Sequence, residues 1–263
     1  MSQYYKPNRN LDWNYGGKNF RLSRSRIALF LECPRCFYID NKLGVARPPG
    51  FPFSLNSAVD ELLKREFDVH RAKNEAHPLM KEYDIDAVPF AHKELDAWRD
   101  ALKRGVQYTH NPTGLAVRGG IDDVWKGSDG KLIVVDYKAT SKKTEVNLDA
   151  EWQDSYKRQI EIYQWLFRRN GFDVSDTGYF VYANADSDKE AFDGKLEFDI
   201  KIIPYVGNDD WVEPTLFKIK ETLDADKIPK ASDVCDYCNY RGAVAEVSPK
   251  PKKKSEGEKS TLF

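Results

Sequence analysis

The spacing of apolar residues along the chain predicts alternating helices and strands. After Ser54, apolar residues such as Leu55, Val59 and Leu62 recur at helical spacing, which predicts a helix from 54 to about 73. Serine caps, glycine stops and similar periodicity predict further helices at 23–32, 91–104 and 151–169. Runs rich in β-branched and aromatic residues predict strands at 115–125, 131–140, 177–184 and 196–204. This order indicates an α/β fold.

Two of these strands are joined by Gly127-Ser-Asp-Gly130, a sequence typical of a hairpin turn. If the loop centres on Asp129, Asp122 lies directly opposite Asp136, with Cβ atoms roughly 5 Å apart. The two-residue period of a strand then puts Lys138 on the same face as Asp136. Facing like charges destabilise a sheet, so this pair indicates a site for a divalent cation. Taken alone, Asp136 and Lys138 are equally compatible with a surface ion pair.

An aspartate followed by Asp-x-Lys on the paired strand resembles the signature of the PD-(D/E)XK nuclease superfamily. Gly119-Gly-Ile-Asp122 and Val134-Val-Asp-Tyr-Lys-Ala-Thr140 resemble its RecB-like branch, which is similar to CRISPR-adaptation nucleases. The resemblance covers most of residues 21 to 240. It implies a restriction-endonuclease-like αβββαβ core, with a mixed sheet flanked by helices, that hydrolyses DNA phosphodiester bonds as an exonuclease or endonuclease in repair, recombination or defence.

The resemblance also implies roles for the hairpin residues. Asp122, Asp136 and the backbone carbonyl of Tyr137 would hold one or two Mg²⁺ or Mn²⁺ ions, and Lys138 would act on the attacking water and the phosphate. In RecB-like nucleases an earlier helix contributes a metal-binding histidine through Gly-x-x-x-His. Here Asn56 replaces the glycine and Asp60 the histidine. An aspartate suits Mg²⁺ or Mn²⁺, although Asp60 is also compatible with an ordinary solvated helix position.

The helix after the hairpin carries Gln159 and Tyr163, which match the Gln-x-x-x-Tyr motif of the same family. Their spacing puts both on one helix face. Trp152 and Tyr156 share that face, so Gln159 is expected to point inward. The site lysine or a scissile phosphate would then be its partner. A core tyrosine beside a locally satisfied glutamine is the alternative.

Four cysteines form two C-x-x-C pairs, Cys33/Cys36 and Cys235/Cys238. Two such pairs without a spare cysteine indicate a metal site. Related RecB-like nucleases close their chain ends around a [4Fe-4S] cluster, but use one cysteine before the core and three after it. The arrangement here departs from that pattern, so the sequence leaves a [4Fe-4S] cluster, Zn²⁺ and structural thiols without a metal open. Either metal centre would act as a staple between the N- and C-terminal parts.

The net charge of −1 means that any nucleic-acid surface must be a local patch. Lys142, Lys143 and Arg158 are the candidates for contact with the DNA backbone, single- or double-stranded. Conversely, a catalytically silent nucleic-acid- or protein-binding module on a nuclease fold, with a structural cysteine-metal site, is the alternative function. The retained Asp, Asp-x-Lys and Gln-x-x-x-Tyr residues favour the enzyme.

Composition divides the chain into an N-terminal arm (1–20), the nuclease domain (21–245) and a disordered basic tail (246–263). No apolar run reaches the roughly 20 residues of a membrane helix and the N-terminus resembles no secretory signal, so a cytoplasmic location is expected. Leu262 and Phe263 at the end of the tail resemble the short peptides that bind a sliding clamp; a plain solubilising tail is the alternative.

Overall fold

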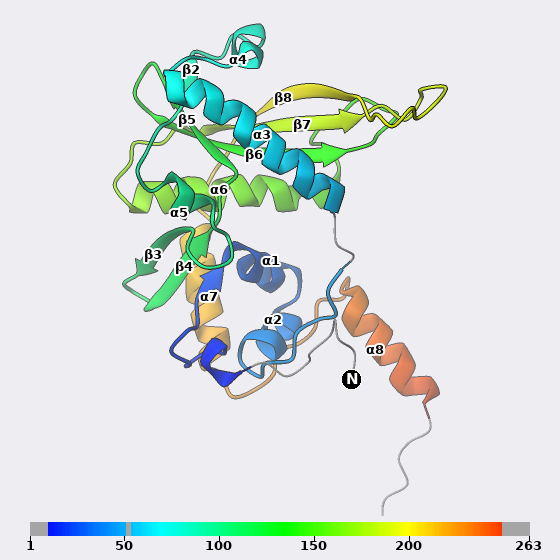
Figure 1. Cartoon of the computed structure of the whole chain (residues 1–263). Helices are drawn as coiled ribbons and strands as arrows, with labels where there is room; N and C mark the ends of the chain where they lie inside the picture. The colour runs from blue at the N-terminus through cyan, green and yellow to red at the C-terminus, as the bar shows by residue number, and fades with distance from the viewer. Residues whose placement is uncertain (1–9, 51–53, 249–263) are drawn as a thin grey trace, which may run out of the picture.

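The protein is described by a computed structural model that covers residues 10–50 and 54–248 of the 263-residue chain. A five-stranded sheet lies between helix α3 (Ser54–Lys73) on one face and helix α6 (Asp154–Arg169) on the other (Figure 1). Two apolar clusters fill the spaces between these layers. Leu63 and Phe67 of α3 pack on one face of the sheet, and Ile160 of α6 belongs to the cluster on the other.

The remaining elements extend this framework. The other α-helices are α1 (Arg24–Glu32), α2 (Pro34–Asn41), α4 (Pro78–Glu82), α5 (Leu95–Arg99), α7 (Val212–Asp224) and α8 (Asp236–Val247), and the 3-10 helices are η1 (Leu11–Trp13) and η2 (Glu151–Gln153). The strands are β1 (Leu22–Ser23), β2 (Ala87–Pro89), β3 (Val106–His110), β4 (Leu115–Gly119), β5 (Asp123–Gly127), β6 (Leu132–Thr140), β7 (Thr177–Ala185) and β8 (Phe198–Val206).

The large sheet has the strand order β2-β5-β6-β7-β8 and is mixed. Strands β6 and β7 run parallel, with α6 as the crossover between them, whereas the other neighbours are antiparallel. If α4, α5, β3, β4 and η2 are left out, the order α3-β2-β5-β6-α6-β7 follows the expected αβββαβ sequence of elements. A second sheet of order β1-β4-β3 lies beside α1 and α7 (Figure 1).

The predicted continuous strand 115–125 is wrong, because the chain leaves one sheet and enters the other within it. β4 ends at Gly119 and β5 begins at Asp123. Close packing accounts for the change at the two glycines. A Cβ atom on Gly119 would lie 2.4 Å from the ring of Tyr163, and one on Gly120 would lie 2.4 Å from Ala101. Because neither glycine carries a side chain, the chain can bend at this point and the hairpin can lie directly against α6.

The predicted helix 91–104 is also largely wrong. Only Leu95–Arg99 is α-helical, and the chain then turns through Gly105, with a φ of +76°, into β3. Leu95 and Trp98 are buried, so these apolar residues do face the core as expected. The helix that carries them is little more than one turn long. By contrast, the helices at 23–32, 54–73 and 151–169 and the strands at 131–140, 177–184 and 196–204 are confirmed within a few residues.

The described part of the proposed N-terminal arm contains η1, and Phe20 from the same stretch is buried in the main core. None of the helices within residues 10–50 and 54–248 has both the length and the apolar character needed to cross a membrane. Leu262, Phe263 and most of the proposed basic tail lie outside the described residues, so clamp binding stays a prediction.

Candidate active site and four-cysteine centre

The hairpin of β5 and β6 brings Asp122 and Asp136 together. Asp123 pairs with Val135, the register that puts Asp122 opposite Asp136 one position beyond the ladder. The Asp136 side chain is fully buried. Asp122 is fixed by a hydrogen bond of 2.9 Å from the backbone N–H of Tyr137 to its Oδ2 atom. The structure thus places the two carboxylates in the expected facing arrangement.

Lys138 extends from the same face of β6 and forms an ion pair with Asp136. Its ammonium lies 4.5 Å from the ring centre of Tyr156 on α6 and 3.5 Å from the Tyr137 carbonyl oxygen. Only 15% of the Lys138 side chain is exposed. The positive charge is therefore confined beside the two carboxylates, in contact with an aromatic face that favours a cation.

Burial raises the pKa of Asp136 to about 7. The neighbouring Lys138 ammonium lowers that pKa, and the negative charge of Asp122 raises it. Removing a carboxylate from water disfavours its charged form, and a second carboxylate adds repulsion that one lysine only partly offsets. A divalent cation would remove this penalty, so the electrostatics favour metal binding.

Gln159 and Tyr163 both face the site from α6. The Gln159 side-chain amide donates a 2.6 Å hydrogen bond to Asp136 Oδ1, and it lies 3.2 Å from the Tyr163 hydroxyl. Among the described residues, the amide N–H of Gln159 is bonded to Asp136 and not to the site lysine, because the buried Asp136 carboxylate needs a donor. A scissile phosphate as partner stays a prediction. Burial raises the pKa of Tyr163 to about 12, although Arg24 at the start of α1 lowers it. The position of Arg24 beside Tyr163 was not predicted from the sequence.

Helix α3 brings Asp60 to the same site. Asn56, one turn earlier, donates a 2.8 Å hydrogen bond from its amide to the Ala139 carbonyl oxygen and joins the helix to β6. Asp60 is partly buried, and this burial together with the charge of Asp122 raises its pKa. Lys64 links the two carboxylates: its Nζ atom lies 2.7 Å from Asp60 Oδ2 and 3.5 Å from Asp122 Oδ1. Lys64 was not predicted.

The three carboxylates share a pattern that suits a metal ion. One oxygen of each is held by a donor: Lys64 for Asp60, the Tyr137 N–H for Asp122 and Gln159 for Asp136. The second oxygen of each carboxylate has a weaker partner or none, or faces a lysine. Asp60 Oδ1 is buried and has no hydrogen-bond partner among the described residues. The second oxygen of Asp122 has a longer contact of 3.5 Å with Lys64, and that of Asp136 faces the Lys138 ammonium.

These second oxygens are hard ligands of the kind that Mg²⁺ and Mn²⁺ prefer. The residues therefore fit a divalent ion. Among the described residues, however, the carboxylates do not form a set whose ligand atoms all lie within 4.8 Å; the four cysteines do. The acidic site is thus more open than the cysteine site.

Asp123, next to Asp122, has a structural environment. It is fully buried and bonds to Arg71, to Arg99 at 3.0 Å and to the Tyr137 hydroxyl at 2.7 Å. Arg99 also donates a 3.1 Å hydrogen bond to the Asp122 carbonyl oxygen. This network fixes the backbone on which Asp122 sits.

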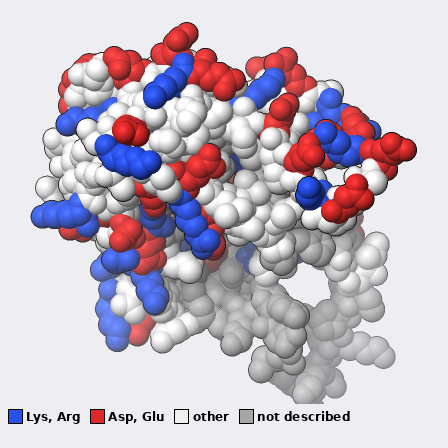
Figure 2. Space-filling view, turned by 45° about the horizontal axis from the view of Figure 1, so that its top comes forward, with Lys and Arg blue, Asp and Glu red and all other residues white. Residues whose placement is uncertain are grey.

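Of the three predicted DNA-contacting residues, Lys142 and Lys143 line one pocket together with Asn184 and Asp199. Lys142 lies 5.3 Å from the ring centre of Trp152, whereas Lys143 forms a 2.8 Å ion pair with Asp188. The positive charge of Arg158 lowers the pKa of Tyr205 on β8. On the face drawn in Figure 2, basic and acidic side chains are intermingled. Trp152, 54% exposed and in edge contact with Tyr156, was not predicted to take part in binding.

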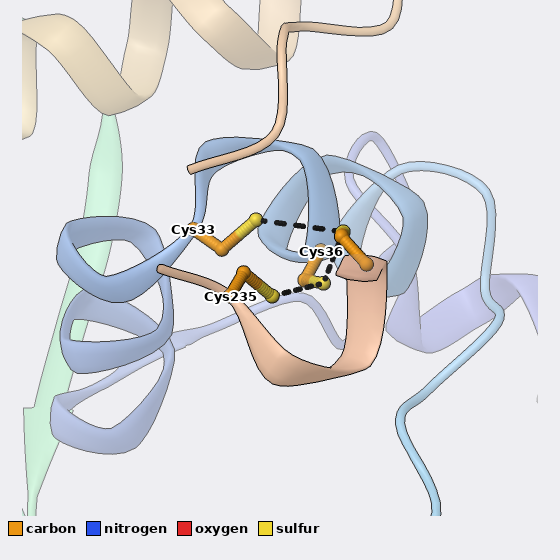
Figure 3. A group of neighbouring side chains, drawn as sticks. Cys33, Cys36 and Cys235 are labelled. Carbon is orange, nitrogen blue, oxygen red and sulfur yellow. Dashed lines mark hydrogen bonds between the residues drawn. The ribbon is translucent and has the colours of Figure 1, made fainter. Parts of the chain in front are cut away.

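The four cysteines meet where the two ends of the domain come together. Figure 3 shows Cys33, Cys36 and Cys235 pointing toward one another from α2 and from the start of α8. The sulfur of Cys238 lies 3.9 Å from that of Cys33 and 3.5 Å from that of Cys36, and Cys36 and Cys235 are 3.7 Å apart. All four are free thiols. Such a cluster could bind a metal ion.

Each cysteine pair occupies a helix N-terminus. Cys33 is the N-cap residue of α2 and Cys235 that of α8. Burial raises the pKa of Cys33, but backbone N–H groups of Cys36 and Ser232 lower it, and the net result is a pKa of about 7. Arg47, which sequence reasoning missed, donates a 3.2 Å hydrogen bond to the Cys235 sulfur. Helix N-termini and an arginine both stabilise thiolates, the form that binds metals.

A family model of the PD-(D/E)XK nuclease superfamily matches residues 21–243. The chain therefore belongs to this superfamily, whose members are in general phosphodiester hydrolases that use divalent metals. No curated protein matches it. Among solved structures, the crystal structure of SSO0001 aligns with 18% identity and a TM-score of 0.28, over 51% of this chain and 52% of that one.

Proposed function

We propose that the protein is a RecB-like, metal-dependent nuclease that hydrolyses DNA phosphodiester bonds. The observation that carries the proposal is the convergence of Asp60, Asp122, Asp136 and Lys138 from a helix and both strands of a hairpin. Membership of the superfamily supports a nuclease in general. The DNA substrate, the choice of Mg²⁺ or Mn²⁺ and the RecB-like type are parts of the proposal, as are a cytoplasmic location and a role in repair, recombination or defence.

The three carboxylates, with the Tyr137 carbonyl at the margin, would hold the divalent ion. When bound, that ion would polarise the scissile phosphate and lower the pKa of a water molecule. Lys138 would orient the attacking water and neutralise charge on the phosphate. Gln159 keeps Asp136 in place through its 2.6 Å hydrogen bond, and Tyr163 packs beside it. Their role is positioning.

Two lysines and two aromatic rings define a path for the substrate, which we name the Lys138–Lys142 path. From the site outward, it contains Lys138 over Tyr156, then Trp152 in contact with Tyr156, then Lys142 near Trp152. Lysines attract the phosphate backbone, and exposed aromatic rings stack on unpaired bases. This alternation supports binding of a single-stranded segment next to the scissile bond.

At the four cysteines we propose a single Zn²⁺ ion. The sulfur atoms around one tetrahedral Zn²⁺, each about 2.3 Å from it, are about 3.8 Å apart. The described separations of 3.5, 3.7 and 3.9 Å lie around that value. In a [4Fe-4S] cluster each thiolate binds a different iron, which requires a wider spacing of the sulfur atoms. The 2+2 arrangement of the cysteines also departs from the iron-sulfur pattern of related nucleases.

Metal analysis after anaerobic purification tests the zinc assignment. We expect a colourless protein with one zinc per chain. A brown protein with several irons per chain would show that the cysteines hold an iron-sulfur cluster instead.

Nuclease activity is tested with single- and double-stranded DNA in Mn²⁺, Mg²⁺ or EDTA. We expect cleavage with the metals only, and a loss of about 10²–10⁴-fold in Asp122→Ala and Lys138→Ala, with unchanged circular dichroism. Asp129→Ala, in the exposed hairpin turn, is the matched control. Full Mn²⁺-dependent activity in both site variants would refute the mechanism. A wild-type protein that binds DNA but cleaves none would favour the silent binding module.

A further inference from the structure

Lys64 is a charged residue that the proposed reaction does not use. It lies one turn after Asp60 on α3, and its Nζ atom contacts Asp60 at 2.7 Å and Asp122 at 3.5 Å. Only 21% of its side chain is exposed. An ordinary ion pair along a helix would be satisfied by Asp60 alone. Lys64 instead reaches across to the hairpin and lies between two carboxylates that would bind metal.

The charges at the site nearly balance without a second ion. Asp60, Asp122 and Asp136 carry three negative charges, and Lys64 and Lys138 carry two positive charges, which leaves −1. One divalent ion would bring the site to +1, matched by the single negative charge of a phosphodiester. A second would bring it to +3 in a partly buried site, where like charges repel strongly.

Most of the neighbouring charges cancel, and the exception, Arg24 beside the Tyr163 hydroxyl, adds positive charge and so disfavours a second cation further. Asp68 and Asp123 pair with Arg71 and Arg99 in the network behind the hairpin. That group contains two acids and two bases and is neutral by itself. The charge balance at the metal site therefore depends on Lys64 and Lys138, with Arg24 at its margin.

We propose that Lys64 takes the place of a second cation, so that the acidic site binds a single divalent ion. The inference rests on the nuclease function proposed above and specifies its metal stoichiometry. Nucleases with two ions hold them about 3.5–4 Å apart, joined by shared oxygen ligands. In this protein the space between Asp60 and Asp122 is spanned by the Lys64 ammonium. A covalently attached charge supplies the electrostatic effect of a second ion without depending on its concentration.

The test counts bound Mn²⁺ by equilibrium dialysis and electron paramagnetic resonance, using the full chain with its cysteine site loaded. The number of ions at the acidic site is the number of Mn²⁺ ions that each protein binds minus the number bound by the same protein carrying Asp122→Ala. We expect one ion for wild type and two for Lys64→Met and Lys64→Gln, with spin coupling between them. Lys73→Met, at an exposed position on the same helix, is the control and should bind one. Circular dichroism verifies that each variant is folded.

Two ions in wild type, or one ion in both Lys64 variants, would overturn the role of Lys64 while leaving the nuclease proposal standing. Absence of any Asp122-dependent ion in wild type would refute the metal-dependent mechanism itself, and the inference with it. The two failures are therefore distinguishable.

Discussion

Asp122 and Asp123 are neighbours in sequence with different environments. The Asp122 side chain is partly exposed and lies between Lys64 and the Tyr137 backbone, with an oxygen available to a ligand. Asp123 is fully buried and bonds to two arginines and a tyrosine hydroxyl. A buried carboxylate with three strong donors stabilises the fold, whereas one facing another carboxylate costs stability unless a cation binds. Identical side chains thus acquire different roles from their partners alone.

The raised pKa of Asp136 predicts a specific dependence of stability on pH. Its pKa is about 7 in the folded protein, compared with about 3.9 for an unfolded chain. Between these values the folded state binds more protons, so the contribution of Asp136 to the free energy of unfolding falls as pH rises from about 4 to above 7. The stabilisation is complete below the unfolded value and lost as pH passes through the folded one.

Urea denaturation from pH 5 to 8.5, without added divalent ions, measures this effect. We expect wild type to lose stability relative to Asp136→Asn as pH rises, since the amide cannot ionise. Asp129→Asn, with its side chain in the exposed turn, should follow wild type. Parallel pH profiles for wild type and Asp136→Asn would show that the Asp136 pKa is not raised.

Among the helices, α6 does most to organise the site. One of its faces presents Tyr156, Gln159 and Tyr163 to the hairpin, while Ile160 and Phe167 are buried in the core. The close approach depends on Gly119, where a Cβ atom would collide with the Tyr163 ring. The helix and the hairpin therefore pack closely against each other. Trp152, in η2 just before α6, contacts Tyr156 and extends this helix face away from the site.

Trp152 offers a test of the Lys138–Lys142 path at the scale of this helix. Stacking of a base on an aromatic side chain contributes about 1–3 kcal/mol. Trp152→Ala should therefore weaken binding of single-stranded DNA by about 5- to 150-fold, raising KM more than it lowers kcat. Leu102→Ala, at an exposed site distant in sequence, is the control.

Fluorescence anisotropy with a labelled oligonucleotide and Ca²⁺ in place of Mn²⁺ measures binding without cleavage. Trp152→Phe should retain most of the affinity, because an aromatic face remains. Equal affinities of wild type and Trp152→Ala would remove Trp152 from the substrate path.

At the scale of the whole molecule, the last described helix meets the rest of the domain at the four-cysteine cluster, where Arg47 also lies 4.4 Å from the ring centre of Tyr237. α8 has no buried residue of its own, and Tyr240 and Val247 are 72% and 84% exposed. Figure 1 shows α8 extending away from the body of the domain. Because α8 has so little apolar contact, we expect its attachment to depend mainly on the cysteine cluster at its N-terminal end. Metal binding there would join segments about 200 residues apart in sequence.

We expect Cys238→Ser to release α8 and to lower the melting temperature of the domain, since the binding energy of a structural metal is coupled to folding. Limited trypsin digestion should then cleave faster at Arg241 within α8. Ala243→Ser on the same helix should behave as wild type. A chelator that removes the metal should reproduce the Cys238→Ser pattern in the wild-type protein. Unchanged proteolysis and melting in Cys238→Ser would indicate that α8 is held by other contacts.

Local sequence determined a large part of this structure. Long periodic segments such as 54–73 became helices, because one apolar face has to be buried along their whole length. The hairpin register followed from the Gly127–Gly130 turn and the two-residue period of its strands, which placed Asp122, Asp136 and Lys138 together. The cysteine spacing likewise indicated one shared site.

Tertiary structure alone decided the rest. Segment 115–125 looks like one strand, but packing of Gly119 against Tyr163 and of Gly120 against Ala101 divides it between two sheets. Lys64 and Arg47 carry no local sign of their roles, since each acts on residues that only the fold brings near: Lys64 on Asp122, and Arg47 on Cys235. Periodicity records which face of an element is buried, whereas the partner of a charged side chain depends on contacts between distant segments.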